Sequence, residues 1–545
     1  DVISFTYKES EDKISITNMN PISDTKGKKN NYFEFKVLSK LKENMNIKYI
    51  VSLSKIDIEN SFEDNDIKMY LTDGNDNELI SPTIISLLEE NKKIKDSKII
   101  YANNFIHNEQ EQTHTYRIRI WLKENVDMSK YTKVVETETG TNVSLEQKTY
   151  KFKINVSTVE QNLDTSGANK PVLASNMIPV YYDEANSVWK KADKNNSQKD
   201  YRWYSYTSTG EYKGMWANAV TVTDANRQTY LNAEPGTTIS MDDINTMWVW
   251  IPRFNAVTPS NYNGGTKDNP GAIDVSFVKQ NERAIDAFTF GNKELSGFWY
   301  GKFEVGGTHA SSCTNETCNV SNIVVKPNMT SLRSKKVSSY FFASRSMEQP
   351  NNSFGFINSE VDTHMSKNNE WGAVAYLTQS IYGRCTSSTS CTEIGINNSM
   401  DNNYKSTTGY GAPPGSDDNA LNGAYNTPRG KDASTTGTIY GIYDMSGGAY
   451  EYVMGVYNNA KSSSGFNSLP GTKYYNNYIT TEYQGHALYG TKGWYYDGNG
   501  VLDTSMSWYA RGGEYSSGAS AGVFNYYTYY GGAAYYSTRF VITNE

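Results

Sequence analysis

The sequence predicts a mainly β protein with some helix (α+β), in which an N-terminal β-sandwich, jelly-roll or Ig-like, precedes a larger β-rich domain. Two patterns predict it: apolar and polar residues alternate along short segments, and polar turns rich in Gly, Asn and Ser separate those segments. The third observation is the length of 545 residues, which is too long for one core and favours two or three domains.

A change in composition places the domain boundary. Residues 1–160 are rich in Lys, Glu, Asp and Ile and hold one of the ten tryptophans, whereas the rest is rich in Gly, Tyr, Ser and Asn. A polar stretch at 157–170, followed by Pro171, is typical of a linker. We therefore predict a sandwich over 1–160, a linker over 161–170, and a second domain over 171–545 with an opening β segment at 171–255.

Alternation predicts the strands of the first domain, where apolar residues share one face at Ile14/Ile16, Tyr32/Phe33/Phe35/Val37, Tyr116/Ile118/Ile120 and Tyr150/Phe152/Ile154/Val156. We expect one helix there, over residues 84–95. In the second domain, the stretches 247–254 (MWVWIPRF) and 297–306 (GFWYGKFEVG) are strand-like. Residues 362–383 carry Trp371, Val374, Ala375 and Leu377 at helical spacing, which predicts a helix packed on the core.

Charge and hydropathy argue against two kinds of partner. The net charge of −7 and pI near 5.5 argue against nucleic acid, which needs clustered basic residues. No apolar run approaches the roughly 18–20 residues that span a bilayer. The chain starts at Asp1 in a strand-like segment, as a mature chain does after its signal peptide is removed. We therefore expect a secreted protein, extracellular or at the cell surface.

The four cysteines form two close pairs in polar loops, Cys313 with Cys318 and Cys385 with Cys391. This spacing favours two small disulfide loops, which persist in an oxidising compartment, and a four-cysteine zinc site is the alternative. No cofactor is expected. Asn- and Asp-rich loops at 398–403 and 415–419 could supply oxygen ligands to a structural calcium ion.

The first domain resembles the camelysin/TasA family of secreted sandwich domains, through its segments at 14–56 and 150–161. Members of that family assemble into fibres, so the resemblance implies copies of this chain as partners and an N-terminal strand that completes the sheet of the next subunit. The polymerisation residues would be Val2, Ile3, Phe5 and Tyr7. Ile3, Phe5 and Tyr7 share one face of an extended strand, as such pairing needs. An ordinary first strand of its own domain is the alternative.

The second domain resembles the formylglycine-generating-enzyme (sulfatase-modifying-factor) branch of the C-type-lectin-like fold, through GKFEV at 301–305, NNEWGAVAYL at 368–377, YGIYDMSGGAYEYVMG at 440–455, and the stretch 508–542. Two departures matter. Residues 515–540 contain no cysteine, although the oxidising enzymes of the family need a reactive pair there, and the five histidines are scattered. We therefore expect no enzymatic activity, and an oxidoreductase of the formylglycine-generating type is the least favoured alternative. Asp444 and Glu451 are expected to make structural hydrogen bonds.

Tyrosine dominates the segment where those cysteines would lie. Residues 515–536 contain seven tyrosines among Ser, Gly, Ala, Asn and Thr, and no charge. Tyrosine combines a large contact area with little torsional freedom, while Ser, Gly and Asn adapt their hydrogen bonds, as in antibody loops. We expect the rings to point outward, because one member of each adjacent pair in a strand must face away from the core.

The tail further resembles the variable C-terminus of proteins diversified by retroelements. This implies a hypervariable recognition surface at Tyr509, Tyr515, Ser516, Ser517, Ser520, Tyr526, Tyr527, Tyr529, Tyr530, Tyr535 and Tyr536. The expected function is a secreted bacterial surface or fibre subunit that displays a non-catalytic domain for a protein or glycan ligand. A structural fibre subunit without a specific ligand, and a low-complexity tail without variability, are the alternatives.

Overall fold

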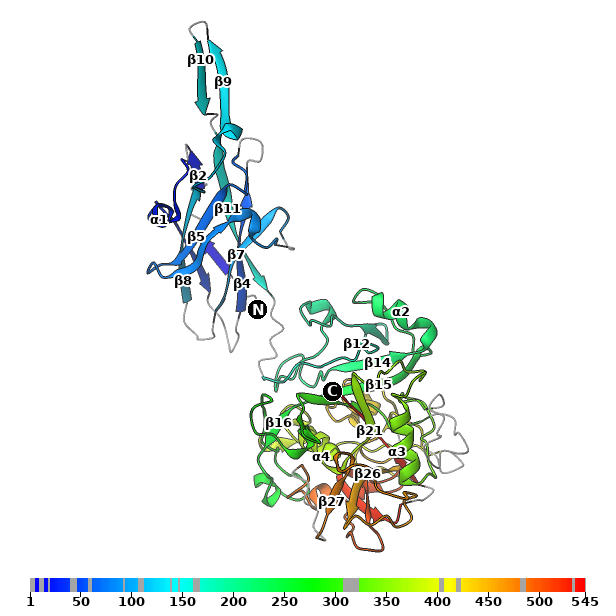
Figure 1. The fold of residues 1–545 in the computed structure, drawn as a ribbon. Helices are drawn as coiled ribbons and strands as arrows, with labels where there is room; N and C mark the ends of the chain where they lie inside the picture. Colours follow the sequence, from blue (N-terminus) through cyan, green and yellow to red (C-terminus); the bar gives the residue numbers. More distant parts are fainter. Residues whose placement is uncertain are drawn as a thin grey trace. The chain divides into compact units, whose positions relative to one another are not determined.

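In the computed structural model, the chain forms two compact units, Asp1–Leu163 and Asp164–Glu545, both mainly β (Figure 1). The division falls inside the stretch expected to be a linker. Residues described by the structure are 5–8, 14–17, 20–39, 47–56, 61–91, 94–105, 112–137, 140–145, 148–159, 167–306, 323–400, 406–417, 423–480, 487–531 and 535–544. Among these residues, no helix combines the length and apolar character that crossing a bilayer requires.

Two antiparallel sheets build the first unit. One has the order β1 (Phe5–Lys8), β3 (Phe33–Ser39), β8 (Gln112–Leu122), β5 (Ile67–Asp73) and β6 (Glu78–Ile84). The other has the order β2 (Ile14–Thr17), β11 (Thr149–Val159), β4 (Ile47–Lys55) and β7 (Ser97–Phe105), and a hairpin of β9 (Thr132–Thr137) and β10 (Gly140–Leu145) stands apart. The predicted alternation supplies the shared core, since Phe35, Ile118 and Phe152 are buried in it.

The N-terminal segment lies at the edge of a sheet. Phe5–Lys8 pairs with β3 of the same chain, Phe5 opposite Ser39 and Lys8 opposite Lys36. Phe5 and Tyr7 therefore belong to an edge strand of their own unit, whereas Val2 and Ile3 lie outside the described residues.

The helix predicted over residues 84–95 is wrong. Ile84 ends β6, where it lies opposite Lys68 of β5, and Ile85–Leu87 makes a single 3-10 turn. Leu87 is 73% exposed, so the apolar residues of this segment do not form one buried helical face. Sheet pairing takes precedence over local helix propensity here.

A seven-stranded sheet forms the larger layer of the second unit. Its order is β13 (Val188–Lys191), β12 (Ile178–Asp183), β14 (Asn218–Val222), β15 (Ile244–Pro252), β20 (Gly297–Gly301), β31 (Phe540–Asn544) and β21 (Val361–Met365). The predicted strands at 247–254 and 297–306 are thus β15 and β20. Strand β31 from the end of the chain lies between β20 and β21 and pairs with both.

A second sheet carries the tyrosine-rich segment. It contains β27 (Asn476–Tyr478), β26 (Tyr450–Tyr457), β28 (Trp508–Gly512) and β29 (Gly522–Tyr529) in this order, and β30 (Tyr536–Thr538) pairs with residues 450–452 of β26. The helix predicted over 362–383 is confirmed in its middle part as α4 (Asn368–Thr378), whose residues are all buried. Residues 362–365 belong to β21 instead, and 379–383 form turns after the helix. Trp371 of α4 donates a hydrogen bond to Val523 O at 2.9 Å and so ties the helix to β29.

The remaining elements are short. They are α1 (Asp24–Gly27), α2 (Asp224–Asn232), α3 (Val337–Ser346) and α5 (Pro428–Asp432), and the strand pairs β16–β17 (Phe254–Ala256, Val275–Phe277), β18–β19 (Thr289–Phe290, Lys293–Glu294), β22–β23 (Cys385–Ser387, Ser390–Cys391) and β24–β25 (Tyr410–Gly411, Gly423–Ala424).

Candidate ligand-binding surface

The adjacent tyrosine pairs of the tail split between core and solvent, as strand geometry predicts. Tyr527, Tyr530 and Tyr535 are 43%, 41% and 43% exposed. Their neighbours Tyr526 and Tyr536 are buried, and Tyr529 is half-buried. The exposed half of the segment is therefore a row of phenol rings on the outer side of β29 and beside β30.

The expectation that all the tail tyrosines point outward is wrong for Tyr509, Tyr515, Tyr526 and Tyr536, which are at most 5% exposed. Strand alternation turns Tyr509 and Tyr526 toward Arg511, whose guanidinium lies 4.8 and 5.3 Å from their ring centroids. Arg511 is itself buried and donates to Asn368 of α4 at 2.8 Å. These rings form part of the support beneath the surface.

The three serines assigned to the surface lie in one turn. Ser516 and Ser520 are exposed, and Ser517 is half-buried. Their side chains are engaged locally: Ser517 Oγ accepts from Glu514 N at 3.0 Å, Ser520 Oγ donates to Ser517 O at 2.8 Å, and Ser516 Oγ donates to the Glu514 carboxylate. The hydroxyls thus close the turn, in the manner of short polar side chains at chain reversals.

Five tyrosine rings form a continuous series of contacts, here called the tyrosine ladder: Tyr530, Tyr529, Tyr536, Tyr450 and Tyr527. Successive ring centroids are 4.1, 5.0, 5.1 and 5.5 Å apart. These separations are typical of favourable offset and tilted aromatic pairs. The exposed rings at the two ends therefore rest on the half-buried rings of Tyr529 and Tyr450, which limits their freedom before any partner arrives.

Hydrogen bonding and burial raise the pKa of three of the ladder's phenols. The Tyr529 and Tyr530 hydroxyls lie 2.8 Å apart, and this hydrogen bond raises the pKa of Tyr529. Burial raises the pKa of Tyr450 and of Tyr536. These three hydroxyl groups therefore stay protonated near neutral pH, and the ladder offers ring faces and hydroxyl groups.

Tyr450 is a member of the ladder that sequence reasoning missed. It lies in the GGAYEYV part of the signature, and it contacts both Tyr527 and Tyr536. Its neighbour Tyr452 stacks on Tyr536 at 4.5 Å. The alternation of Tyr450, Glu451 and Tyr452 could have indicated a strand with both tyrosines on one face. The rings that Tyr450 contacts lie on β29 and β30, which are distant in sequence.

Buried charges hold the sheet that carries the ladder. Glu451, between Tyr450 and Tyr452, accepts from Arg539 Nε at 3.0 Å, and burial raises the pKa of Glu451 to about 7 although Arg539 opposes the shift. Asp444 accepts from Gly409 N at 2.9 Å and from Asn397 Nδ2 at 2.8 Å. These are the structural hydrogen bonds expected for the two acidic residues.

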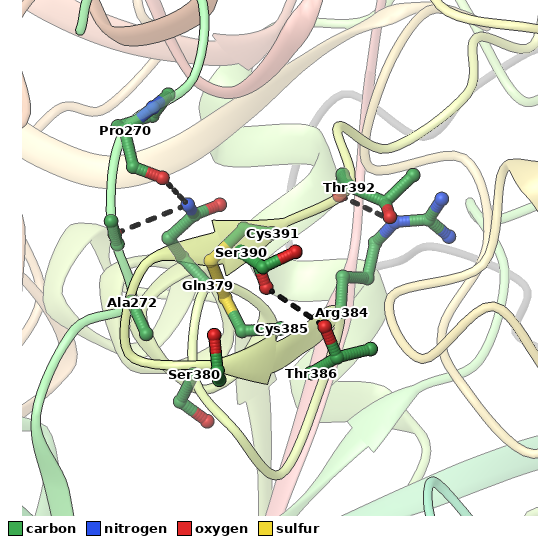
Figure 2. Close-up of a disulfide and its surroundings, with 12 residues drawn as sticks. Pro270, Ala272, Gln379, Ser380, Arg384, Cys385, Thr386, Ser390, Cys391 and Thr392 are labelled. Atoms are coloured by element: carbon green, nitrogen blue, oxygen red, sulfur yellow. Dashed lines mark hydrogen bonds between the residues drawn. A yellow bond between two sulfur atoms is a disulfide. The ribbon is translucent and has the colours of Figure 1, made fainter. Parts of the chain in front are cut away.

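One of the two expected disulfides is present. Cys385 and Cys391 are joined across β22 and β23, and Figure 2 shows the bond that links the two strands of this hairpin. Two of the four thiols are therefore unavailable as zinc ligands. Cys313 and Cys318 lie outside the described residues.

Within the described ranges, no three His, Cys, Asp or Glu side chains lie close enough to one another to bind one metal ion. The two loops considered for calcium fall partly outside those ranges, at 401–405 and at 418–419.

No protein-family model matches this chain. No curated protein matches its sequence significantly.

Proposed function

We propose that the second unit is a non-catalytic recognition domain of the C-type-lectin-like kind, which binds a protein or glycan through the exposed part of the tyrosine ladder. The observation that carries this proposal is the arrangement of Tyr527, Tyr529 and Tyr530, which reach solvent while they contact other rings of the ladder. Tyrosine is enriched where proteins bind partners, because one ring buries much area at small entropic cost. The exposed Tyr535 beside β30 extends the same surface.

The scaffold supports this proposal. The signature residues Asp444, Glu451 and Arg539 hold the ladder's strands from inside, as a fixed framework beneath a variable surface would require. A retroelement-diversified origin would explain why Tyr, Ser, Gly and Asn occupy the tail positions, and the gene's neighbourhood would reveal a template repeat.

An extracellular location fits the same proposal. The Cys385–Cys391 disulfide persists where the medium is oxidising, and reducing compartments rarely retain such bonds. The unit would then meet its ligand outside the cell.

A binding screen tests the proposal. The purified full chain is applied to a glycan array and to a displayed peptide library, alongside a variant carrying Tyr527→Ala, Tyr529→Ala and Tyr530→Ala. We expect the ligands that the native chain selects to lose at least tenfold in affinity for the variant, because the central contact rings are removed. A matched control, Tyr489→Ala with Tyr496→Ala, removes two exposed tyrosines elsewhere in the unit and should bind normally. Equal losses in both variants, or selected ligands that ignore the ladder, would contradict the proposal.

A second function, self-assembly into fibres, is favoured by the edge position of β1. Among the strands that the structure describes, β1 pairs with β3 alone. Exchange between copies would therefore replace the pairing of four residues, Phe5–Lys8, by the same pairing with a neighbour. Electron microscopy of a chain lacking residues 1–8 should then show no fibres, and a synthetic peptide of these residues should shorten the fibres of the native chain. Fibres that persist in the truncated chain would remove strand exchange from consideration.

A further inference from the structure

A small cavity lies at the start of strand β29, the strand that carries Tyr527 of the tyrosine ladder. Its volume is about 10 Å³, which is room for roughly one water molecule. The end of α4 lines it at 378–379, together with residues 384 and 392–394, residues 495 and 497, and the first residues of β29 at 522–523. Parts of the chain that are distant in sequence therefore meet around one small space.

Asp497 is the buried acid of this cavity. It is 2% exposed, and its Oδ2 atom accepts a hydrogen bond from Phe524 N of β29 at 2.8 Å. The other carboxyl oxygen, Oδ1, is buried without a hydrogen-bond partner. A Cβ atom at Gly522 would overlap both oxygens, so glycine lets the backbone of β29 lie directly against the carboxyl group. A buried polar atom without a partner costs free energy, and the cost is larger when the group is charged.

The residues that follow Asp497 continue along the same strand. Gly498 N donates to Ser520 O at 2.9 Å, Tyr526 N donates to Gly498 O at 3.0 Å, and Gly500 N donates to Tyr526 O at 2.9 Å. Strand β29 is the last in the order of its sheet, and this segment pairs with it beside β28. The contact of Asp497 with Phe524 is therefore the first of a series that holds the outer edge of the ladder strand.

The charged groups around Asp497 do not neutralise it. Arg384 is a cation in the cavity wall, but its guanidinium donates to Thr392 O and to Ser434 O, each at 2.9 Å (Figure 2 shows the first of these bonds). Within the part of the chain that the structure describes, no Lys, Arg or His side chain forms an ion pair with Asp497. The half-buried Glu393 adds a second carboxyl group to the wall.

Burial and like charge both favour the neutral form of this acid. Burial raises the pKa of Asp497 well above its ordinary value, and Glu393 raises it further, whereas the N–H groups of Phe524 and Asn525 lower it. Burial also raises the pKa of Glu393 to about 7, although Arg384 opposes this shift. Asp497 therefore stays neutral to a higher pH than an ordinary aspartate does.

The other titratable groups near the cavity are few. Tyr495 lines it and exchanges hydrogen bonds with Gln379, and Asp432 acts on Arg384 from outside the lining. Strand β29 contributes no acidic or basic side chain apart from its tyrosines, and the lining residues of α4 and its end do not titrate. Asp497 and Glu393 are thus the carboxyl groups whose ionisation can change this contact.

We propose that Asp497 is a proton-dependent contact, which holds the start of β29 while its carboxyl group is neutral and loosens that strand when it ionises. An ionised Asp497 would have one oxygen without a partner and would face Glu393, so admitting water would stabilise it. The cavity has room for roughly one water molecule, so its walls must then separate. Tyr495 and Tyr496 have φ values of 55° and 66°, which are strained for residues other than glycine, and their turn is the wall that we expect to move. The contact needs no ligand, so it stands or falls separately from the proposed function.

Amide hydrogen exchange of the full chain tests the proposal. Protection factors, which are corrected for the intrinsic effect of pH on exchange, are measured for Phe524 and Asn525 between pH 5 and pH 10. Because the folded state raises the pKa of Asp497, its stabilisation is present at low pH and is lost as the pH rises through the folded value. We expect protection to fall at least tenfold over this range, while the amides of β14 in the other sheet change less than threefold. Constant protection in β29, or an equal fall in β14, would overturn the proposal.

Asp497→Asn separates the carboxyl group from every other titrating group. Asparagine has the same shape and keeps an oxygen that accepts from Phe524 N, but it cannot ionise. Protection in β29 of this variant should stay constant over the same pH range. Asp503→Asn, at an exposed aspartate of the same stretch, is the matched control and should keep the native pH dependence. A pH dependence that survives Asp497→Asn would remove Asp497 as its cause.

Glu393→Gln tests the coupling of the two carboxyl groups. Without the negative charge of Glu393, Asp497 ionises more readily, so the loss of protection should move to a lower pH. If Asp497→Asn fails to fold, the direction of this shift decides the question, because it uses a different residue and the native Asp497. An unchanged midpoint, or one at a higher pH, would overturn the proposal.

Discussion

Glu451 and Arg539 form an ion pair that is closed off from solvent, with 1% or less of either side chain exposed and Arg539 Nε donating to the carboxylate at 3.0 Å. The pair joins strand β26 to the residue that precedes β31. Arg539 also donates to Gly301 O at 2.8 Å and to Tyr443 O at 2.9 Å, so one side chain connects both sheets of the second unit. Tyr450 and Tyr536 of the ladder lie one and three residues from this pair.

Arg539→Met is expected to destabilise the second unit by about 3–5 kcal/mol, because it leaves the Glu451 carboxylate buried without its partner. Tryptophan fluorescence during urea unfolding measures this unit, which holds nine of the ten tryptophans. The double variant Arg539→Met with Glu451→Gln should recover part of the loss. A single variant within 1 kcal/mol of the native chain would contradict the structural role of the pair.

Tyr536→Ala and Tyr535→Ala should behave differently although the residues are adjacent. Tyr536 is buried and stacks on Tyr450 and Tyr452. Its truncation should lower the free energy of unfolding by about 3–5 kcal/mol, in the range for large buried aromatic residues. Tyr535 is exposed, and its truncation should change stability by about 0.5 kcal/mol or less. Thermal unfolding of both variants checks the difference. Equal losses of stability would contradict the assignment of Tyr536 as buried and Tyr535 as exposed.

Stability should depend on pH through His364. Burial lowers its pKa, but the carboxylates of Glu370 and Asp362, each 3.1 Å from a ring nitrogen, raise it more, so the net shift is upward. A histidine whose folded pKa exceeds its unfolded value contributes stability below about pH 6.5, and this contribution is lost as the pH rises through the folded value.

The stability difference between the native chain and His364→Gln should therefore shrink as the pH rises from 6 to 9. Urea unfolding at several pH values measures the difference, and NMR of the imidazole reports the pKa directly. A difference that grows with pH would contradict the assigned direction of the shift.

Removing the Cys385–Cys391 disulfide should lower the free energy of unfolding by about 2 kcal/mol, because the bond closes a loop with a sequence separation of six residues. The variant Cys385→Ser with Cys391→Ser, or the reduced native chain, should show this loss in denaturant unfolding. The same change frees the hairpin whose Cys385 carbonyl holds Lys213, so the lysine should exchange its amine protons faster. A variant as stable as the native chain would indicate that the β22–β23 pairing alone holds the hairpin.

Sequence reasoning worked best where a pattern is local and one face is buried. The alternation at Phe35/Val37 and at Phe152/Ile154 predicted strands whose apolar faces fill the first core. The spacing of Trp371, Val374 and Leu377 predicted α4. At residues 84–95 the same reasoning was wrong. Ile84 pairs with Lys68 of another strand, and helix propensity does not take such a long-range contact into account.

The amino-acid sequence by itself determined the mainly β character of the chain and the Cys385–Cys391 pair, and it indicated that one ring of each adjacent tyrosine pair faces outward, since alternation and short separations are encoded locally. Only the tertiary structure decided which tyrosines reach solvent and which rings they rest on. Tyr450 and Tyr527 come together because β26, β28, β29 and β30 pair across distant parts of the chain. The cavity beside Asp497 likewise gathers segments that are distant in sequence. Strand register and loop closure set such contacts, and no local pattern of residues specifies them.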